Sequence, residues 1–472
     1  MEKILAWLQK TVDTVNSYAA DYILVVLLIG AGVFFTFRTR FVQIRCFGEG
    51  MKKVFGKISL KGGKQKGGLS SFQALTTAVA AQVGTGNIVG ACGAILIGGP
   101  GAIFWMWVIA FFGMATIYAE AVLAQKTREV DENGNVMGGP VFYIKKAFNN
   151  NFGKILAGFF AVAIVLALGF MGTMVQSNSI GESVGGAMGI DPWIVGIVIA
   201  VLAGAVFLGG VNRIASVTEK LVPLMAVLYL LGGLVIIGIR IKYVPEAFAM
   251  IFKYAFQPQA ILGGGIAAAL KAAISQGAKR GLFSNEAGMG STPHAHALAK
   301  VEKPHDQGVV AMVGVFIDTF VVLTMTALVV ISCLYAGDAE AWKAAGVENT
   351  NMVQRSISVA LSSFLSAGAA VKIGAIFVAV CLLFFAFSTI ISWNLFGKIN
   401  FQYLFGKKAV IIYSVLAIGF VFLGSCLKSD LVWSLTDFFN YLMVIPNAVA
   451  LIALNKIVNE EAKNGIRLNK IK

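Results

Sequence analysis

The chain has 472 residues, of which 58% are hydrophobic and only 13% charged, and its mean hydropathy is +0.80. This composition excludes an ordinary soluble protein and is typical of a polytopic membrane protein. The net charge of +15 would fit a nucleic-acid partner, but the basic residues are concentrated in particular loops. We therefore attribute the charge to membrane topology and expect no nucleic-acid partner.

The chain begins with a mixed segment and continues with eleven apolar stretches. Residues 1–20 combine charged and apolar side chains without a long apolar core or a cleavage site, which indicates an amphipathic helix at the membrane surface. Most of the apolar stretches are near the ~20 residues that cross a bilayer as a helix. They lie at about 21–37, 71–98, 101–125, 154–186, 193–210, 221–239, 262–299, 308–335, 371–397, 409–426 and 431–454. The expected fold class is an all-α membrane protein with eleven transmembrane helices.

The basic residues predict the orientation of these helices. Segment 38–70 carries nine of the 38 Lys and Arg residues, so we expect it in the cytoplasm. Alternate connections counted from there place the N-terminus outside and the basic tail, residues 456–472, in the cytoplasm. A single compact chain with short loops and no targeting peptide suits a multi-pass protein of a bacterial plasma (inner) membrane.

One apolar stretch is interrupted at residues 80–90. Its centre carries Gln82, Thr85 and Asn87 among three glycines. Glycine weakens a helix by roughly 1 kcal/mol relative to Ala, so we expect the helix to unwind here. Inside a membrane, unwound backbone is tolerated where it lines a cavity. Half-helix ends offer amides to an anion and carbonyls to a cation, which suits a zwitterion bound together with a cation.

A second interruption of the same kind lies at residues 281–291. In both, a polar side chain is followed by Gly-x-Gly and a small polar residue: Gln82-Val83-Gly84-Thr85-Gly86-Asn87 and Glu286-Ala287-Gly288-Met289-Gly290-Ser291. Broken helices at matching positions of two repeats indicate a transporter site. The predicted organisation is a surface helix, an accessory transmembrane helix and a basic loop at 1–70, two inverted five-helix repeats at 71–240 and 241–455, and the tail at 456–472.

Three stretches resemble the alanine/glycine:cation symporter family. They are the run from Gly98 to Trp107 with Gly113 after it, the run from Gln82 to Asn87, and the run from Arg280 to Gly288. The resemblance extends from about residue 15 to residue 455. It implies a LeuT-type fold with ten core helices plus one, and the import of alanine or glycine with sodium as the coupling ion. It also implies a transporter rather than an enzyme, with no cofactor.

The first break is the expected site of the substrate's charged groups. The amides of Thr85 and Gly86 would hold its carboxylate, with the Thr85 hydroxyl as a further donor. The substrate ammonium would bind carbonyls near Gln82 and around Phe283 and Ser284. The alternative is that these glycines serve close helix packing, but the clustered polar residues favour a binding site.

Ser388 and Thr389 lie in an otherwise apolar stretch. By the family resemblance they look like the paired hydroxyls of a sodium site, and the carbonyls of Ala80 and Val83 are implied to face them. Such oxygens suit a hard cation. Without the resemblance, the two hydroxyls would more simply bond carbonyls of their own preceding turn. Asn87 would bind a second sodium ion, if the protein uses two.

Four residues complete the expected substrate cavity, each with an alternative. Phe283 and Trp393 are expected to wall the cavity so that little more than a methyl group fits, or else to be ordinary packing residues. Gln176 and Asn178 either line the cavity or join helices by hydrogen bonds.

Ionisable residues at membrane depth are functional candidates by default. Glu286 is expected to pair with Arg280 or Lys279 in a structural role, and the role of Asp318 stays open. Glu120, Glu182 and Asp437 lie nearer the ends of their stretches, where a solvated or capping role is expected. The three histidines lack a Cys or carboxylate that would complete a metal site.

Together with the family resemblance, these observations favour a sodium-coupled symporter that imports a small neutral amino acid by alternating access. The alternative is a sodium-independent or proton-coupled carrier or exchanger of the same fold, which would need an essential carboxylate such as Glu286. A channel would show a repeated filter motif, and an enzyme a nucleophile with its base or a metal cluster; neither pattern is present. The choice among alanine, glycine and serine, the stereochemistry, the number of sodium ions and the oligomeric state are left open.

Overall fold

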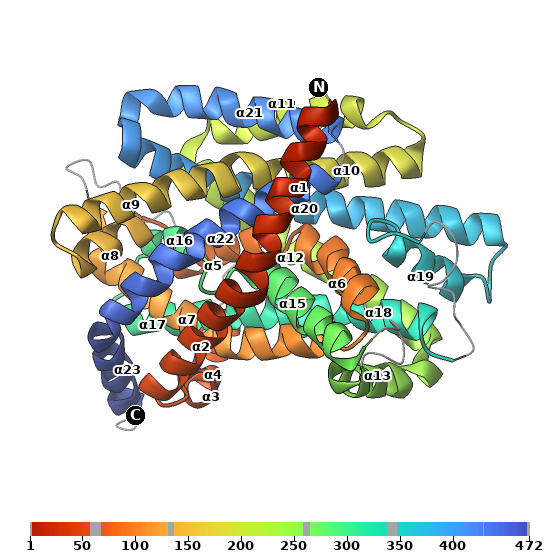
Figure 1. Ribbon diagram of the computed structural model, residues 1–472, viewed down its shortest axis with the longest axis horizontal. Helices are drawn as coiled ribbons and strands as arrows, with labels where there is room; N and C mark the ends of the chain where they lie inside the picture. Colours follow the sequence, from red (N-terminus) through yellow and green to blue (C-terminus); the bar gives the residue numbers. More distant parts are fainter. Residues whose placement is uncertain are drawn as a thin grey trace.

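The computed structural model describes residues 2–56, 68–130, 136–257, 265–337, 347–427 and 429–469. Within these ranges the regular elements are helices apart from one short hairpin, in which β1 (Glu129–Val130) pairs antiparallel with β2 (Val136–Met137). Most long helices run along the longest dimension of the molecule, side by side (Figure 1).

Among the described residues, seven helices are long and apolar enough to cross a membrane, and one bent pair raises the number to eight. The seven are α7 (Ala102–Thr127), the rod of α9 (Asn151–Ile164), η3 (Val165–Gly172) and α10 (Thr173–Met188), α12 (Gly210–Ile239), the rod of α17 (Pro304–Val315), η5 (Phe316–Leu323) and α18 (Thr324–Leu334), α20 (Ala367–Phe405), α21 (Val410–Cys426) with η7 (Lys407–Ala409) before it, and α22 (Ser429–Ala453). Two shorter apolar helices, α2 (Val25–Arg38) and α11 (Pro192–Phe207), coincide with further predicted spans. The total of eleven spans stays a prediction.

The N-terminal helix α1 (Glu2–Tyr18) is not separate from the first apolar helix. It continues through the π-helical segment η1 (Ala19–Leu24) directly into α2. In Figure 1 this rod crosses the front of the molecule, where α1 lies beside α22. The side chains of Gln9 and Asn16 donate hydrogen bonds of 2.8 Å to the hydroxyl and the carbonyl of Ser434. The expected surface helix is therefore attached to α22 by polar contacts.

The first broken helix consists of α5 (Ser71–Gln82), η2 (Gly86–Gly90) and α6 (Ala91–Gly98), with a bend of 46° between its halves. Its start is capped by Ser70, whose hydroxyl accepts from the Gln73 amide while the Gln73 side chain accepts from the Ser70 amide. This reciprocal cap satisfies two amides that a helix start leaves free. The helix ends where Val83 leaves helical geometry (ψ 89°).

The second broken helix differs from the prediction in where it unwinds. The helix α15 (Ile266–Asn285) continues past Gly281 and ends at Glu286, which has a left-handed backbone (φ 57°). Gly288 and Gly290 also have positive φ, and α16 (Pro293–Leu298) follows. A single glycine costs a helix only about 1 kcal/mol, so Gly281 does not end it. The break therefore spans 286–292 rather than 281–291.

The two broken helices meet at one end of the molecule. Leu69, just before α5, forms a parallel bridge with Ala299, just after α16. The Leu69 amide donates to the Leu298 carbonyl at 2.9 Å, and the Lys300 amide donates to the Leu69 carbonyl at 2.8 Å. The start of one broken helix thus lies beside the end of the other, as two inverted repeats require. The repeat boundaries themselves stay a prediction.

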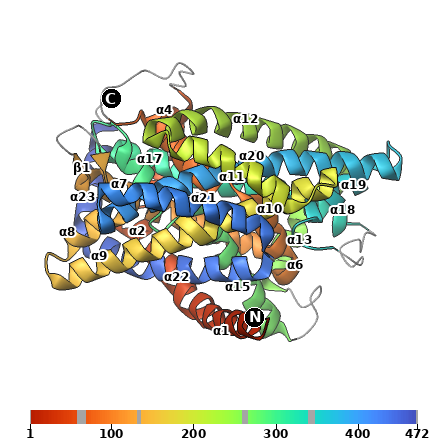
Figure 2. The ribbon, with the colours of Figure 1, turned by 90° about the horizontal axis from the view of Figure 1, so that it is seen from above.

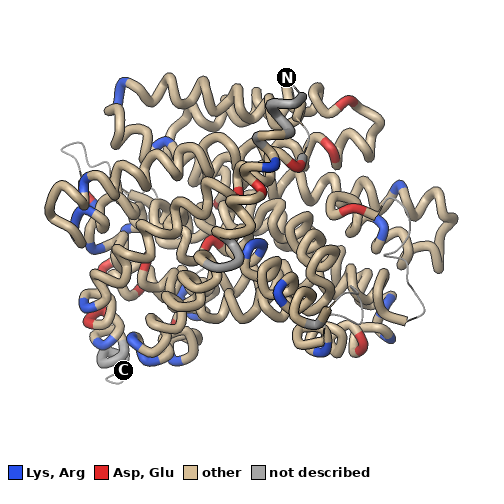
Figure 3. The backbone as a smooth tube through the Cα atoms, in the orientation of Figure 1, with Lys and Arg blue, Asp and Glu red and all other residues tan. Residues whose placement is uncertain are grey.

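Short helices cover the two ends of the bundle. At one end lie α3 (Val42–Arg45), α4 (Phe47–Phe55), α8 (Pro140–Ala147) and α23 (Asn455–Asn469), and at the other η4 (Ile241–Tyr243), α13 (Val244–Phe256) and α19 (Met352–Leu361). Figure 2 separates α8 and α23 from α13 and α19 in the same way. Lys and Arg gather around α8 and α23 (Figure 3), so we refer to that end as the basic end and to the other as the opposite end.

Candidate functional site

The first break lies between α10 and α20. The Gly84 amide donates to Asn87 Oδ1 at 3.0 Å, and the Thr85 amide donates to Gln176 Oε1 at 3.2 Å. A Cβ atom at Gly84 would lie 2.5 Å from Thr389 Oγ1 and 3.1 Å from Gln176 Oε1. A side chain at position 84 would therefore push the first break away from α10 and α20. Glycine at this position allows the break to pack closely against both helices.

Several buried polar atoms at this break have no hydrogen-bond partner among the described residues. They are Gln82 Oε1, Thr85 Oγ1 and Gln176 Nε2. The other end of the Gln82 amide is used, because its Nε2 donates to the Asn285 carbonyl at 2.7 Å. An unpaired buried polar group costs about 1–3 kcal/mol. A polar ligand that pairs these atoms recovers that free energy, so the arrangement favours binding here.

The end of α15 packs against the first break. A Cβ at Gly86 would lie 3.1 Å from Phe283 Cδ1 and 3.1 Å from Ser284 Cα. The expected residues Gly86, Phe283 and Ser284 are thus brought together, although they are nearly 200 positions apart in the chain.

The last turn of α15 leaves two carbonyls without their helical donors. The Ala287 amide donates to Asn285 Oδ1 at 3.1 Å, and the Gly288 amide to Glu120 Oε2 at 3.1 Å. In a continued helix these amides would bond the carbonyls of Phe283 and Ser284, four residues earlier. Free carbonyls at a helix C-terminus carry partial negative charge and attract a cation. This end of α15 therefore suits a cationic group.

The hydroxyls of Ser388 and Thr389 reach across to α5. Thr389 Oγ1 lies 2.8 Å and Ser388 Oγ 3.4 Å from the Ala80 carbonyl. Both hydroxyls also lie within hydrogen-bond distance of the Phe385 carbonyl on their own helix, at 3.0 and 2.8 Å. The expected contact with the Ala80 carbonyl and the alternative contact with the helix's own preceding turn are thus both formed. Val83 ends α5 three residues after Ala80, and the converging oxygens are of the type a hard cation prefers.

Asn87 connects the first break to a buried carboxylate. Its Nδ2 donates to Asp318 Oδ1 at 2.6 Å, while its Oδ1 accepts from the Gly84 amide. Asp318 also accepts from the hydroxyls of Ser284 and Thr319, at 2.9 and 2.8 Å. It lies on the π-helical η5, a type of segment common at functional sites. Within the described ranges no Lys, Arg or His pairs with it, so its charge must be compensated in another way.

The aromatic residues expected to wall the cavity are in contact. The rings of Phe283 and Trp393 meet edge to face with centroids 5.7 Å apart. The Trp393 indole N–H donates to the Glu286 carboxylate, which fixes the orientation of the ring. A tilted contact of 4.8 Å joins Phe283 to Trp433 on α22. Phe283 therefore stands beside Gly86, and Trp393 packs against the Phe283 ring.

Asn178 lies away from this break, two residues beyond Gln176 on α10. Its Nδ2 donates to the carbonyls of Gly424 and Leu427, at 3.2 and 2.9 Å, at the end of α21. Residues two apart on a helix do not share a face. The contacts of Asn178 fit the alternative of a helix-joining residue, whereas those of Gln176 fit a residue of the site.

The second break is held by Glu120, for which a solvated or capping role was expected. That expectation is wrong, because Glu120 is fully buried. Its carboxylate accepts from the amides of Gly288 and Gly290, at 3.1 and 2.9 Å, and from Asn447 Nδ2 at 2.6 Å. The turn at 286–292 folds onto α7 at this point. The feature of the sequence that could have indicated this role is the Gly-x-Gly turn, because its amides need an acceptor once they are buried.

The expected pairing of Glu286 with Arg280 is also wrong. Glu286 accepts from Ser291 Oγ at 2.5 Å and from Trp393. Arg280 reaches Asp437 on α22 at 3.5 Å, and its guanidinium lies 4.7 Å from the centre of the Trp433 ring. Arg280 lies on α15, whereas Glu286 follows the end of that helix with a left-handed backbone, so the two side chains face different neighbours.

A further group of potential metal ligands lies at the basic end. Cys46, Glu49 and His305 bring one ligand atom each within 4.8 Å, so the expectation that no Cys or carboxylate joins a histidine is wrong for His305. Both His305 nitrogens are already hydrogen-bonded, to Tyr118 at 2.7 Å and to Glu49 at 3.3 Å. Burial raises the pKa of the Cys46 thiol to about 11, which disfavours the thiolate that binds metals. We attribute this group to packing.

Comparison with known proteins finds transporters, both by sequence and by fold. A sequence profile described as "Sodium:alanine symporter family" matches residues 5–469. The sodium/alanine symporter AgcS of Methanococcus maripaludis is 43% identical over 464 residues, which cover 98% of each protein. An uncharacterized transporter of Haemophilus influenzae is 41% identical over 468 residues, 98% of this chain and 97% of that protein.

A solved structure shares the fold at much lower sequence identity. MhsT in complex with L-phenylalanine matches with a TM-score of 0.56 and 14% identity, over 84% of this chain and 100% of that chain. MhsT is a LeuT-fold transporter. The expected fold class, an all-α membrane protein of the LeuT type, is therefore confirmed.

Proposed function

The chain belongs to the sodium:alanine symporter family, and from that premise we propose that it imports alanine or glycine across the plasma membrane together with sodium. It is a multi-pass membrane protein and a transporter rather than an enzyme. The proposed mechanism is alternating access, in which the two repeats rock around a site formed by the two breaks.

One observation carries the sodium coupling: the Ala80 carbonyl on α5 and the hydroxyls of Ser388 and Thr389 on α20 converge beside the first break. A sodium ion bound by these oxygens, with the Val83 carbonyl as a further ligand, would link α5 to α20. The same link would stabilise the break at which the substrate binds. Sodium would then raise the affinity for the amino acid, which is what coupling requires.

The contacts of the first break support a zwitterionic substrate. The amides of Thr85 and Gly86 would hold the carboxylate, and the unpaired Thr85 hydroxyl would add a donor. The carbonyls of Phe283 and Ser284 would receive the ammonium group. With the Phe283 ring beside Gly86 and the Trp393 ring packed against it, the side chain of the substrate would be limited to hydrogen or methyl.

The proposed direction of transport follows from the basic residues. With the basic end in the cytoplasm, the N-terminus lies outside and the C-terminal helix α23 inside. Import with sodium then moves one positive charge inward, which contributes about 2.3 kcal/mol for each 100 mV of membrane potential.

A proton-coupled carrier is the second candidate, and Asp318 favours it. This carboxylate is buried beside the first break and accepts hydrogen bonds from Asn87, Ser284 and Thr319. A proton on Asp318 would neutralise its charge without any basic side chain. On this alternative Asp318, rather than Glu286, is the essential carboxylate, because Glu286 is engaged with Ser291 and Trp393 at the second break.

Uptake of labelled alanine into proteoliposomes separates the two candidates. The sodium symporter requires uptake driven by an imposed sodium gradient, lost when choline replaces sodium, and weakened in Thr389→Ala. The proton-coupled carrier requires uptake driven by a proton gradient without sodium, lost in Asp318→Asn and retained in Thr389→Ala. Uptake that is indifferent to sodium would overturn the primary proposal.

A further inference from the structure

A small polar cavity lies next to the proposed site on the side of the opposite end. It has a volume of about 200 Å³. Three of its lining residues belong to the elements of the site: Ser179 lies three positions after Gln176, Val89 three after Gly86, and Leu382 seven before Thr389. At a helical rise of 1.5 Å per residue, these offsets are about 5–10 Å.

The cavity lies between the site and the opposite end of the molecule. From Gln176, α10 runs on to end at Met188, and from Gly86, η2 and α6 run on to Gly98. The remaining wall is formed by Thr350, Asn351 and Gln354 at the start of α19, a helix of the opposite end. If the opposite end is extracellular, a substrate coming from outside passes this cavity before it reaches the first break.

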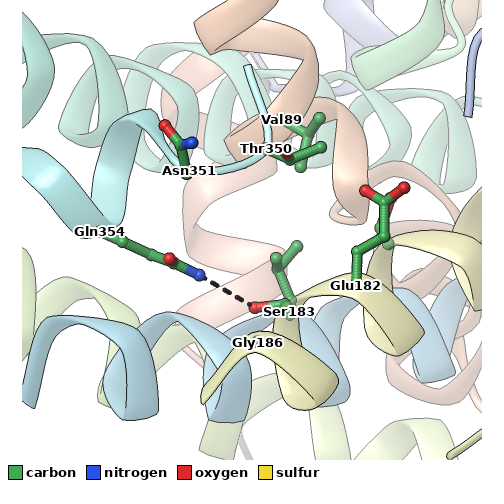
Figure 4. Close-up of a pocket in the computed structure, with 9 residues that line it drawn as sticks. Val89, Glu182, Ser183, Gly186, Thr350, Asn351 and Gln354 are labelled. Carbon is green, nitrogen blue, oxygen red and sulfur yellow. Dashed lines mark hydrogen bonds between the residues drawn. The ribbon is translucent and has the colours of Figure 1, made fainter. Parts of the chain in front are cut away.

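The cavity carries one negative charge and no positive one. Glu182 is the sole ionisable residue among those that line it, and the other polar side chains are hydroxyls and amides. In Figure 4, Glu182 stands on one side of the cavity, and Asn351 and Gln354 stand on the other. No hydrogen bond or ion pair to Glu182 is formed within the part of the chain that the structure describes. Its carboxylate is therefore available to a ligand.

A second observation points to a ligand independently of the charge. Ser179 is 2% exposed, lines the cavity, and its Oγ has no hydrogen-bond partner among the described residues. Next to it, Ser183 Oγ accepts a long bond of 3.4 Å from Gln354 Nε2. A buried hydroxyl without a partner is costly, so the cavity holds one unsatisfied hydroxyl oxygen, that of Ser179, beside the carboxylate of Glu182.

We propose that this cavity is an outer site that binds a small monovalent cation, either the ammonium group of the amino-acid substrate or a hydrated sodium ion. The volume of the cavity is large enough for either ligand. At about 30 Å³ per water molecule, 200 Å³ holds roughly seven water-sized groups. That is more than a bare ion needs and enough for a small amino acid or an ion with part of its water shell. The inference that the substrate or the ion occupies this site during transport rests on the proposed function.

Thiol labelling tests the charge preference of the cavity without requiring transport. Four of the five cysteines are buried and Cys426 is exposed, so the background variant is Cys426→Ser. In that background, Ser183→Cys places a thiol in the cavity. The reaction rates of a methanethiosulfonate reagent bearing an ammonium group and one bearing a sulfonate are then compared in the reconstituted protein.

The ammonium reagent is expected to react about tenfold faster than the sulfonate reagent, because a single charge in a recessed site raises the local concentration of counter-ions. Adding Glu182→Gln is expected to reduce this preference to about one. The matched control is Glu246→Gln, which removes the same charge from exposed α13 at the same end and is expected to change nothing. A preference that survives Glu182→Gln would overturn the proposal.

Protection from labelling identifies the natural cation. Alanine in sodium-free choline buffer slows the ammonium reagent if the substrate binds here, and sodium without alanine slows it if the ion does. If neither slows the reaction, the cavity contains only water and the proposal is overturned. In uptake, Glu182→Gln is expected to raise the half-saturating concentration of the protecting cation about three- to tenfold, with the maximal rate within twofold. A wild-type protein that does not take up alanine would refute the proposed function, while the labelling ratio still decides on the cavity.

Discussion

The two breaks share the pattern of a polar residue followed by Gly-x-Gly, but their surroundings are opposite. At the first break the amide of Thr85 is held by a neutral side chain, Gln176, at 3.2 Å, and polar atoms beside it lack partners. At the second break the amides of Gly288 and Gly290 are held by the chain's own carboxylate, Glu120. The first is therefore prepared for a ligand, whereas the second is already occupied.

This difference assigns the two breaks different tasks. An anionic ligand can replace the neutral Gln176 side chain as the acceptor of the Thr85 amide, whereas the amides of Gly288 and Gly290 already donate to a carboxylate. The second break, with its amides used, contributes the carbonyls at the end of α15 and an anchored turn against α7. Similar sequence motifs can thus serve binding in one place and attachment in the other, and the neighbouring helices decide which.

The largest expected effect is from removing the anchor of the second break. Glu120→Ala leaves the amides of Gly288 and Gly290 without their acceptor, whereas Asn447 Nδ2 still donates to the Gly288 carbonyl. At about 1–3 kcal/mol for each of the two unsatisfied amides, the loss of stability should be about 2–6 kcal/mol. Thermal unfolding in detergent measures it, with Glu129→Ala on the exposed β1 strand as a control. If Glu120→Ala unfolds at the wild-type temperature, Glu120 is not an anchor.

Next in size is the effect of adding one methyl group to the first break. In Gly84→Ala, the new Cβ would lie 2.5 Å from Thr389 Oγ1, so the break must move away from α20. A displacement of about 1 Å at a binding site can cost about 100-fold in rate, and we expect alanine uptake to fall by that factor. In Gly90→Ala the nearest atom is 3.9 Å away, so uptake should stay within about twofold. Equal losses in the two variants would contradict this account.

A smaller effect distinguishes the two hydroxyls that face Ala80. Thr389 Oγ1 lies 2.8 Å from the Ala80 carbonyl and Ser388 Oγ lies 3.4 Å from it. Thr389→Ala should therefore raise the half-saturating sodium concentration about tenfold, equivalent to ~1.4 kcal/mol, and Ser388→Ala about threefold. Sodium titrations of alanine uptake measure both. The reverse order would show that the ion does not lie between Thr389 and Ala80.

The features that could be predicted from the sequence are those that depend on neighbours in the chain. Apolar stretches of about 20 residues located the helices, because crossing a bilayer imposes that length. The cluster of glycine and polar residues located the first break, because both weaken a helix locally. The second break was placed about five residues early, because Gly281 is compatible with a helix and the left-handed Glu286 could not be foreseen.

The features that could not be predicted depend on which distant elements meet. Nothing near Glu120 in the sequence shows that a turn about 170 residues later will supply two amides to it. The contact between Asn87 and Asp318 joins residues 231 positions apart, and it brings a carboxylate to the first break that the motif alone does not reveal. Both carboxylates were visible as ionisable residues at membrane depth, but their partners come from tertiary packing.

The smallest effect separates two neighbouring residues of α10. Gln176 accepts from the Thr85 amide at the first break, while Asn178 donates to carbonyls at the end of α21. Gln176→Ala should raise the half-saturating alanine concentration only about threefold, because the freed Thr85 amide can bond the substrate carboxylate instead. Asn178→Ala should leave that concentration unchanged but lower the free energy of unfolding by about 1–2 kcal/mol, since it leaves carbonyls of α21 unpaired. Uptake titrations and thermal unfolding of both variants test whether Gln176→Ala changes mainly the alanine affinity and Asn178→Ala mainly the stability. If Asn178→Ala changes the alanine affinity, Asn178 belongs to the binding site. The site would then extend from the first break toward α21, and the assignment of Asn178 to helix packing would be wrong.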